Sequence, residues 1–177
     1  MELENLRQEC LNCRRCGLCD TRTNVMFVGE GPGASEDEQG LPFVGRSGQL
    51  LDHYLEAVDL SRDTNVYIAN IVKCRPPQNR DPLPEESTAC MPWLRQQFQL
   101  IRPKIVVCLG RIAAQQMMGP TFSVSRDHGK FFEKQGTLFM ATYHPAALLR
   151  YPVNKPAVFG DFVALRGKIT QVCDHTY

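Results

Sequence analysis

Hydrophobic residues along this chain gather in short apolar runs that alternate with amphipathic stretches. Four such runs, at 25–30, 65–72, 104–110 and 137–143, consist mainly of β-branched, aromatic and other apolar residues. Runs of this length with little polar alternation are typical of strands that are buried on both faces of a parallel sheet. We therefore predict four strands at these positions.

Between the runs, apolar residues recur at helical spacing. In 45–58 the apolar residues, Tyr54 among them, fall on one helical face. Three further helices are predicted, one beginning near Glu85 and the others over 111–118 and 156–172. The segment 119–136 is expected to be a loop or hairpin. Four prolines in 74–84 fix φ and remove donors, so this stretch is predicted to be irregular.

Strands that alternate with helices indicate an α/β fold with a mainly parallel four-stranded sheet. A length of 177 residues favours one domain, 1–177, with a cysteine-rich arm at 1–24. Ligands bind beyond the carboxyl ends of the strands in such sheets. The segment GEGPG (29–33), Asn70 and His144 all stand at or near predicted strand ends, so we expect them to meet at one rim.

Composition and charge narrow the choice of partner only slightly. No apolar run reaches the roughly 18 residues of a membrane span, and the polar, acid-containing N-terminus does not resemble a signal peptide, so we expect a cytoplasmic protein with no membrane contact. The net charge of +1 argues weakly against nucleic acid. Basic residues in loop-like segments nevertheless offer a local basic face; they are Arg14, Arg15, Arg46, Lys73, Arg75, Arg80 and Arg150.

Eight cysteines in a chain of cytoplasmic type favour metal or cluster ligation over disulfides. In one interpretation the regularly spaced N-terminal cysteines, Cys10 to Cys19, wrap an iron–sulfur cluster by themselves. In another, Cys13 and Cys16 act together with Cys74 and Cys90, which would explain the stiff proline-rich loop. Zinc also suits four thiolates, and spacing alone does not choose the metal.

The remaining two cysteines, Cys108 and Cys173, are expected to be ordinary thiols. The glycine-rich turn at 29–33 is weak evidence for a dinucleotide site, because Pro32 interrupts the pattern and the next strand ends without an acid. Such a turn also lets the backbone approach a flat ligand. Phe43 is placed to stack on a base, and the Asn70 amide can both donate to and accept from a base edge.

These motifs, taken in order, resemble the family 4 uracil-DNA glycosylases. The matching segments are CRRC (13–16), TRTN (21–24), VMFVGEGPG (25–33), LPFVGRSGQLLD (41–52), NIVKCRPPQNRDP (70–82), Cys90 and HPAALLR (144–150). The resemblance implies a three-layer α/β/α sandwich. It also implies a structural 4Fe–4S cluster held by Cys13, Cys16, Cys74 and Cys90.

The same resemblance implies monofunctional hydrolysis of the deoxyuridine glycosidic bond in base excision repair, which leaves an abasic site. No helix-hairpin-helix motif or Schiff-base lysine is evident. His144 would stabilise the departing uracil, and Glu30 or Glu36 would position water or, for Glu36, exclude thymine. The remaining implied roles are uracil binding by Gly31, Phe43 and Asn70, phosphate binding by Arg46, Ser47 and Gly48, and insertion of Leu148 or Leu149 into the duplex.

One departure from the family pattern lies between TRTN and the first strand, where relatives carry an additional segment. A sheet-edge strand or a loop of that pattern is therefore expected to be missing. We expect a monomer that acts on uracil-containing DNA. The main alternative is a non-catalytic iron–sulfur or zinc nucleic-acid-binding module of the same fold. An iron–sulfur electron carrier, and a domain of the kind fused to some phage DNA polymerases, are two others.

Overall fold

The central element is a five-stranded sheet of order β2-β1-β3-β5-β4. The computed structural model describes residues 23–173. The strands are β1 (Val25–Gly29), β2 (Val66–Asn70), β3 (Ile105–Leu109), β4 (Phe131–Lys134) and β5 (Thr137–Thr142). The first four in the spatial order are parallel, and β4 runs antiparallel to β5.

Alternating side chains of the sheet feed two separate cores. Val25 and Phe27 of β1 point into one core, and Met26 and Val28 point into the other. This alternation follows from the two-residue period of a strand, and it requires a helical layer on each face. The sequence expectation of apolar strands that are buried on both faces is therefore confirmed.

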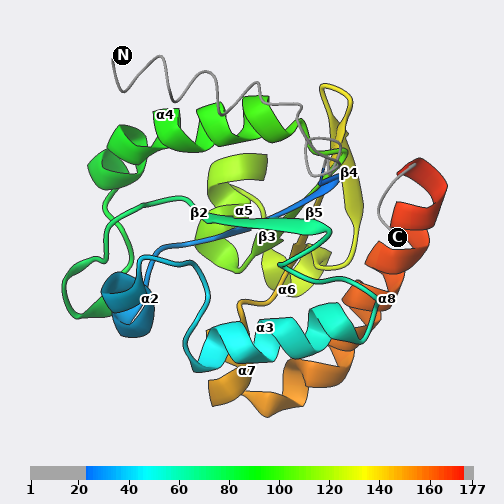
Figure 1. The fold of residues 1–177 in the computed structure, drawn as a ribbon, viewed down its shortest axis with the longest axis horizontal. Coiled ribbons are helices and arrows are strands. Elements are labelled where there is room, and N and C mark those ends of the chain that lie inside the picture. Colours follow the sequence, from blue (N-terminus) through cyan, green and yellow to red (C-terminus); the bar gives the residue numbers. More distant parts are fainter. Residues whose placement is uncertain (1–22, 174–177) are drawn as a thin grey trace.

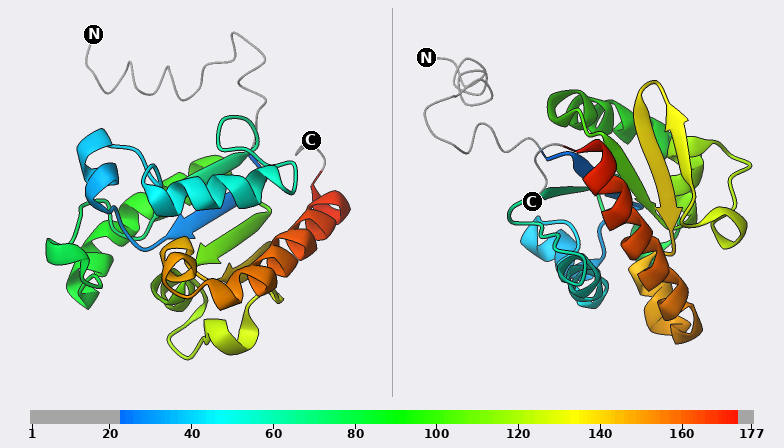
Figure 2. Two further views of the ribbon diagram at one scale, coloured as in Figure 1. Left: turned by 90° about the horizontal axis from the view of Figure 1, so that it is seen from below. Right: turned by 90° about the vertical axis from the view of Figure 1, so that its right-hand side faces the viewer.

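Helices supply the two outer layers, as Figure 1 shows. The first face is covered by α3 (Arg46–Glu56), α7 (Pro145–Arg150) and α8 (Lys155–Val172). The second face is covered by α4 (Pro84–Ile101), α5 (Arg111–Met118) and α6 (Val124–Asp127). The expected α/β/α sandwich is confirmed, and the two views of Figure 2 show the sheet twisting between these layers.

The predicted elements need three corrections. The sheet has five strands, not four, because 131–134 pairs with β5 as a hairpin within the segment that was expected to be a loop or hairpin. The stretch after GEGPG contains a short helix, α2 (Ala34–Gln39), for which no element was predicted. A helix α7 follows β5 directly, and short 3₁₀ turns lie at Pro77–Asn79 and Pro152–Asn154.

No helix within residues 23–173 has the length and apolar character needed to cross a membrane.

Candidate active site

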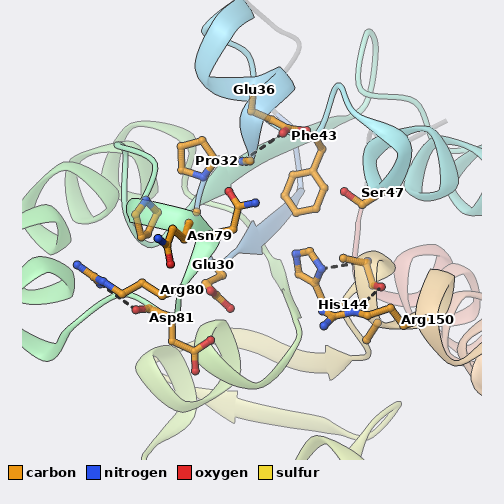
Figure 3. A pocket seen from close by; sticks show the side chains of 16 residues that line it. Glu30, Pro32, Glu36, Phe43, Ser47, Asn79, Arg80, Asp81, His144 and Arg150 are labelled. Atoms are coloured by element: carbon orange, nitrogen blue, oxygen red, sulfur yellow. Dashed lines mark hydrogen bonds between the residues drawn. The ribbon is translucent and has the colours of Figure 1, made fainter.

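A cavity of about 580 Å³ opens at the carboxyl edge of the parallel strands. From β1 the chain crosses to β2 on one side and then to β3 on the other, so the carboxyl ends of β1 and β3 form a topological switch point, where α/β sheets bind ligands. The cavity is drawn in Figure 3, and its walls come from the segments that follow β1 and β5, from the turn at 76–81 and from the start of α3. Its lining includes Glu30, Gly31, Glu36, Phe43, Ser47, Arg80, Asp81, His144 and Arg150.

Glu36 braces the loops on one side of the cavity. Its carboxylate accepts hydrogen bonds from the backbone N–H groups of Gly33 (3.1 Å), Val44 (2.9 Å) and Gly45 (2.8 Å). Burial favours the protonated form, but these N–H donors outweigh burial and hold the pKa of Glu36 below its ordinary value. Glu36 is therefore an anion whose two oxygens are already engaged in holding the turn at 29–33 against the loop that carries Phe43.

Phe43 is held in a strained position over the cavity. It is buried and has φ 54°, a left-handed conformation that a bulky residue rarely adopts. Arg62 donates to its carbonyl (2.7 Å) and to the Pro42 carbonyl (2.9 Å), and it also pairs with Asp52. The Phe43 ring lies 5.5 Å from the His144 ring at 36°. Such support is what a strained functional residue requires.

Gly48 plays a packing part in the same arrangement. A Cβ at this position would collide with the Phe43 backbone carbonyl, and the residue is buried on α3. Its absent side chain therefore lets α3 approach Phe43.

Asn70 lies beside Phe43 at the end of the neighbouring strand. Gly29 and Asn70 are register partners across β1 and β2. A Cβ on Gly29 would stand 2.5 Å from Phe43 Cζ and 2.6 Å from Asn70 Oδ1, so both side chains occupy the space over this glycine. Asn70 is 6% exposed, and among the described residues its Oδ1 is the buried side-chain oxygen without a hydrogen-bond partner. An orphan acceptor of this kind is costly unless a ligand satisfies it.

His144 begins α7 and has a defined tautomer. Its Nδ1 accepts from the backbone N–H of Ala146 (3.1 Å), so the proton of the neutral ring is on Nε2. Burial, reinforced by the Arg150 guanidinium and opposed by Glu36, lowers the pKa of His144 to about 4. Gly110 makes room for this side chain, because its own Cβ would lie 2.8 Å from His144 Cβ. His144 is thus a neutral donor at neutral pH.

Glu30 is a partly buried acid on the cavity wall. Burial raises its pKa, and nearby Asp81 raises it further, whereas Arg111 and Arg150 lower it. Asp81 pairs with Arg111 at 2.5 Å. Figure 3 shows Glu30 and His144 directed toward the same cavity. This geometry suits a carboxylate that accepts a hydrogen bond inside the cavity.

The residues expected to contact DNA do not all lie at the surface. Arg46 is exposed, and Ser47 lines the cavity. Leu148 is only 1% exposed and belongs to the core under the sheet, so the expectation that it inserts into a duplex is wrong in this structure. Leu149, the second candidate, is 38% exposed. Leu148 and Leu149 differ in exposure because α7 packs one of its faces against α3.

One wall of the cavity was not anticipated from the sequence. The turn at 76–81 lines it, and in this turn Gln78 and Asn79 both have positive φ, near 55°. Arg75 donates to Asn79 Oδ1 (2.7 Å), and Arg80 forms a fork with Glu86 (2.6 and 2.8 Å). The proline-rich composition signalled a stiff loop, but it was interpreted only as support for a cluster.

Two of the four proposed cluster ligands fall within the described residues. Cys74 is exposed, Cys90 is partly buried on α4, and neither forms a disulfide. Accessible free thiols fit thiolate ligation. Cys13 and Cys16, together with Cys10 and Cys19, lie outside the described residues. Within 23–173 no three cysteine, histidine or acidic side chains gather as metal ligands, so this part supplies at most two. Cys108 is buried, which raises the pKa of its thiol to about 12 and supports its interpretation as a core thiol.

The chain also matches a known protein family. The model of the uracil DNA glycosylase superfamily matches residues 16–165. The chain therefore belongs to this superfamily.

The relatives named below all belong to one group within this superfamily, the type-4 enzymes. The type-4 uracil-DNA glycosylase of Archaeoglobus fulgidus is 40% identical over 190 residues, which cover 97% of this chain and 93% of the relative. That of Sulfurisphaera tokodaii is 42% identical over 93% of this chain and 83% of its own length. That of Pyrobaculum aerophilum is 40% identical over 92% of this chain and 90% of its own length. Within the superfamily, this chain groups with the type-4 enzymes.

Proposed function

We propose that this protein hydrolyses the N-glycosidic bond of deoxyuridine in DNA and leaves an abasic site for base excision repair. The observation that carries the proposal is the cavity lined by neutral His144 and the strained Phe43, together with the unsatisfied Asn70 amide, which shares with Phe43 the space over Gly29. The names of the relatives support uracil as the base. A base must leave the duplex stack to reach such a cavity, at a cost of roughly a few kcal/mol.

Phe43 and Asn70 would select the base. The Phe43 ring stacks on the flipped uracil. The unpaired Asn70 Oδ1 accepts from uracil N3–H, while its Nδ2 donates to O4. Cytosine offers an acceptor at N3 and a donor at the adjacent exocyclic position, so with the amide in this orientation it would leave both amide groups mismatched. Gly31 lies at the cavity wall, and its missing side chain lets this loop approach Val72, because a Cβ there would stand 2.7 Å from Val72 Cγ2.

His144 would stabilise the departing base. As the glycosidic bond breaks, negative charge develops on the uracil carbonyl oxygens. The Nε2–H of a neutral imidazole donates to that charge without itself losing a proton. One such preorganised donor typically lowers the barrier by on the order of 3 kcal/mol. The lowered pKa of His144 keeps the ring neutral, so the uracil leaves as an anion that the donor stabilises.

Glu30 is the better of the two candidates for holding water. Both oxygens of Glu36 accept backbone N–H groups, so its lone pairs are largely engaged. Glu30 faces the cavity, and its negative charge would also stabilise the oxocarbenium-like sugar. We assign Glu30 to the water and Glu36 to the architecture of the loops.

Arg46 and Ser47, at the first turn of α3, would contact phosphates next to the flipped nucleotide. A helix start presents free N–H groups and a favourable dipole to an anion. Leu149 would fill the gap that the base leaves. Gly48 serves this site indirectly, through the position of Phe43.

Cys74 and Cys90, with Cys13 and Cys16, would hold a 4Fe–4S cluster. When bound, the cluster would supply a crosslink between the arm, the loop after β2 and α4. Iron analysis and visible absorption of anaerobically purified protein test this assignment. Cys74→Ala should lose iron, whereas Cys19→Ala should retain it. The reverse pattern would favour an N-terminal cluster of ferredoxin type.

Incubation with a single-uracil duplex, followed by alkali, tests the proposed function. We expect free uracil and alkali-dependent strand cleavage, from purified protein without added metal or nucleotide. His144→Ala should slow single-turnover release about a hundredfold or more, with little change in DNA affinity. DNA binding without uracil release would favour a non-catalytic binding module. Strand cleavage before alkali would exclude a monofunctional enzyme.

A further inference from the structure

A buried carboxylate lies outside the cavity, behind the strand that leads to His144. Asp161 on α8 is 5% exposed. Its Oδ2 accepts from Thr142 Oγ1 at 2.5 Å, and both its oxygens lie within 3.0 Å of His128 Nδ1. None of these three side chains lines the cavity.

This group grips the chain immediately before His144. Thr142 is the last residue of β5 and is fully buried. Its carbonyl accepts from the Gly110 N–H (2.9 Å), and Gly110 packs against the His144 side chain. The ring of Tyr143 lies 5.2 Å from the His128 ring. Both residues that precede His144 are therefore held, Thr142 by Asp161 and Tyr143 by His128.

The backbone around His128 is shaped to permit this contact. Gly129 has φ +72°, and a Cβ there would collide with Asp161 Oδ1. Its N–H donates to the Ala141 carbonyl (2.9 Å), which ties the loop after α6 to β5. The positive φ and the close approach to a carboxylate both call for glycine at this point.

Burying a carboxylate among apolar helices has a cost in stability. An apolar side chain of similar volume would commonly be as stabilising as a buried ionic group, or more so. A hydrogen-bonded carboxylate instead fixes the position of its donors, because Asp161 can accept only from groups that lie at particular places. The donor Thr142 lies two residues before His144, so a fixed Thr142 also fixes the chain that carries His144.

We propose that Thr142, Asp161 and His128 form a positioning clamp that sets where the His144 Nε2–H points. The inference rests on the proposed role of His144 as donor to the departing base. A displacement of about 1 Å at a reacting group can cost roughly a hundredfold in rate. The clamp acts on the bond-breaking step and not on DNA binding, because its members lie away from the cavity surface.

Thr142→Val tests the clamp, since it removes the hydroxyl and nearly conserves the shape. We expect single-turnover uracil release to slow at least tenfold, with the Kd for uracil-containing DNA within twofold of the parent. Thr142→Ser, which keeps the donor, should restore most of the rate. Thr170→Val, an exposed threonine on α8, is the matched control and should match the parent.

A double-mutant cycle with His144→Ala separates positioning from general stability. If Thr142 acts through His144, Thr142→Val should cause little further loss in the His144→Ala background. Parental activity of Thr142→Val, equal loss in both backgrounds, or a Thr142→Ser variant as slow as Thr142→Val would each overturn the clamp.

A parallel loss of DNA affinity would overturn it as well. Should Thr142→Val not fold, His128→Phe decides, because it keeps the ring beside Tyr143 and removes the bond to Asp161. His128→Phe should be slower than the parent, and a parental rate would refute the clamp. If His144→Ala itself cleaves at the parental rate, the proposed role of His144 fails. If His144→Ala is slow but Thr142→Val is as fast as the parent, only the clamp fails.

Discussion

Gly29→Ala should displace Phe43 and Asn70, the two residues proposed to bind the base, while leaving the fold intact. The new methyl group would lie 2.5 Å from Phe43 Cζ and 2.6 Å from Asn70 Oδ1, whereas ordinary contacts begin at 3.4 Å. Phe43, Asn70 or both must therefore retreat by up to about 0.9 Å. Overpacking of this size costs about 1–3 kcal/mol. A shift near 1 Å in the groups that hold the base should also slow uracil release by up to about a hundredfold.

The measurement pairs single-turnover uracil release with thermal unfolding. Gly160→Ala is the matched control, since its Cβ on α8 would meet nothing within 4 Å, and it should be as active as the parent and slightly more stable. We expect Gly29→Ala to bind undamaged DNA normally and to lose rate more than stability. A Gly29→Ala protein with the parental rate and melting temperature would refute the packing argument, because it would show that Phe43 and Asn70 do not share the space over Gly29.

Three further predictions follow from the contacts around the cavity. The pKa of His144 in the folded protein is about 4, below its ordinary value of 6.5. Between these pH values the unfolded chain binds a proton at His144 that the folded chain does not, so the folded protein should lose stability as the pH falls from 6.5 toward 4. Urea midpoints measured at pH 7 and pH 5 should therefore differ less in His144→Asn than in the parent. Arg62→Met should destabilise the protein by about 1–3 kcal/mol and slow uracil release, because the Pro42 and Phe43 carbonyls lose a charged donor; urea titration and single-turnover assays check both, and unchanged values would contradict the role of Arg62. Leu148→Ala should lower the free energy of unfolding by about 2–5 kcal/mol, because it truncates a core side chain. Leu149→Ala should leave stability unchanged and should slow cleavage of duplex DNA more than cleavage of single-stranded DNA. Equal melting temperatures for the two variants would contradict the assignment of Leu148 to the core and Leu149 to the surface.

The sequence determined the architecture because its signals are local. Apolar runs such as 25–30 and 104–110 can be satisfied only by burial on both faces of a sheet, and the helices between them follow. Parallel strands carry their end residues to one rim, so the meeting of 29–33 and His144 was predictable. The hairpin strand 131–134 was missed as a fifth strand because it is short and mostly exposed and carries two charged residues after Phe131 and Phe132, so it lacks the continuous apolar run of the others.

Only the tertiary structure decided what individual residues at the rim do. Glu30 and Glu36 are equivalent in the sequence, and they differ because three backbone N–H groups happen to converge on Glu36. Leu148 and Leu149 are adjacent, and the helical turn of α7 buries one and exposes the other. The contact of Asp161 with Thr142 joins residues nineteen positions apart on different elements, so no local pattern contains it. Helix and strand formation depend on neighbours in the chain, whereas hydrogen-bond partners and burial depend on which elements pack together, and that is settled only when the layers close around the sheet.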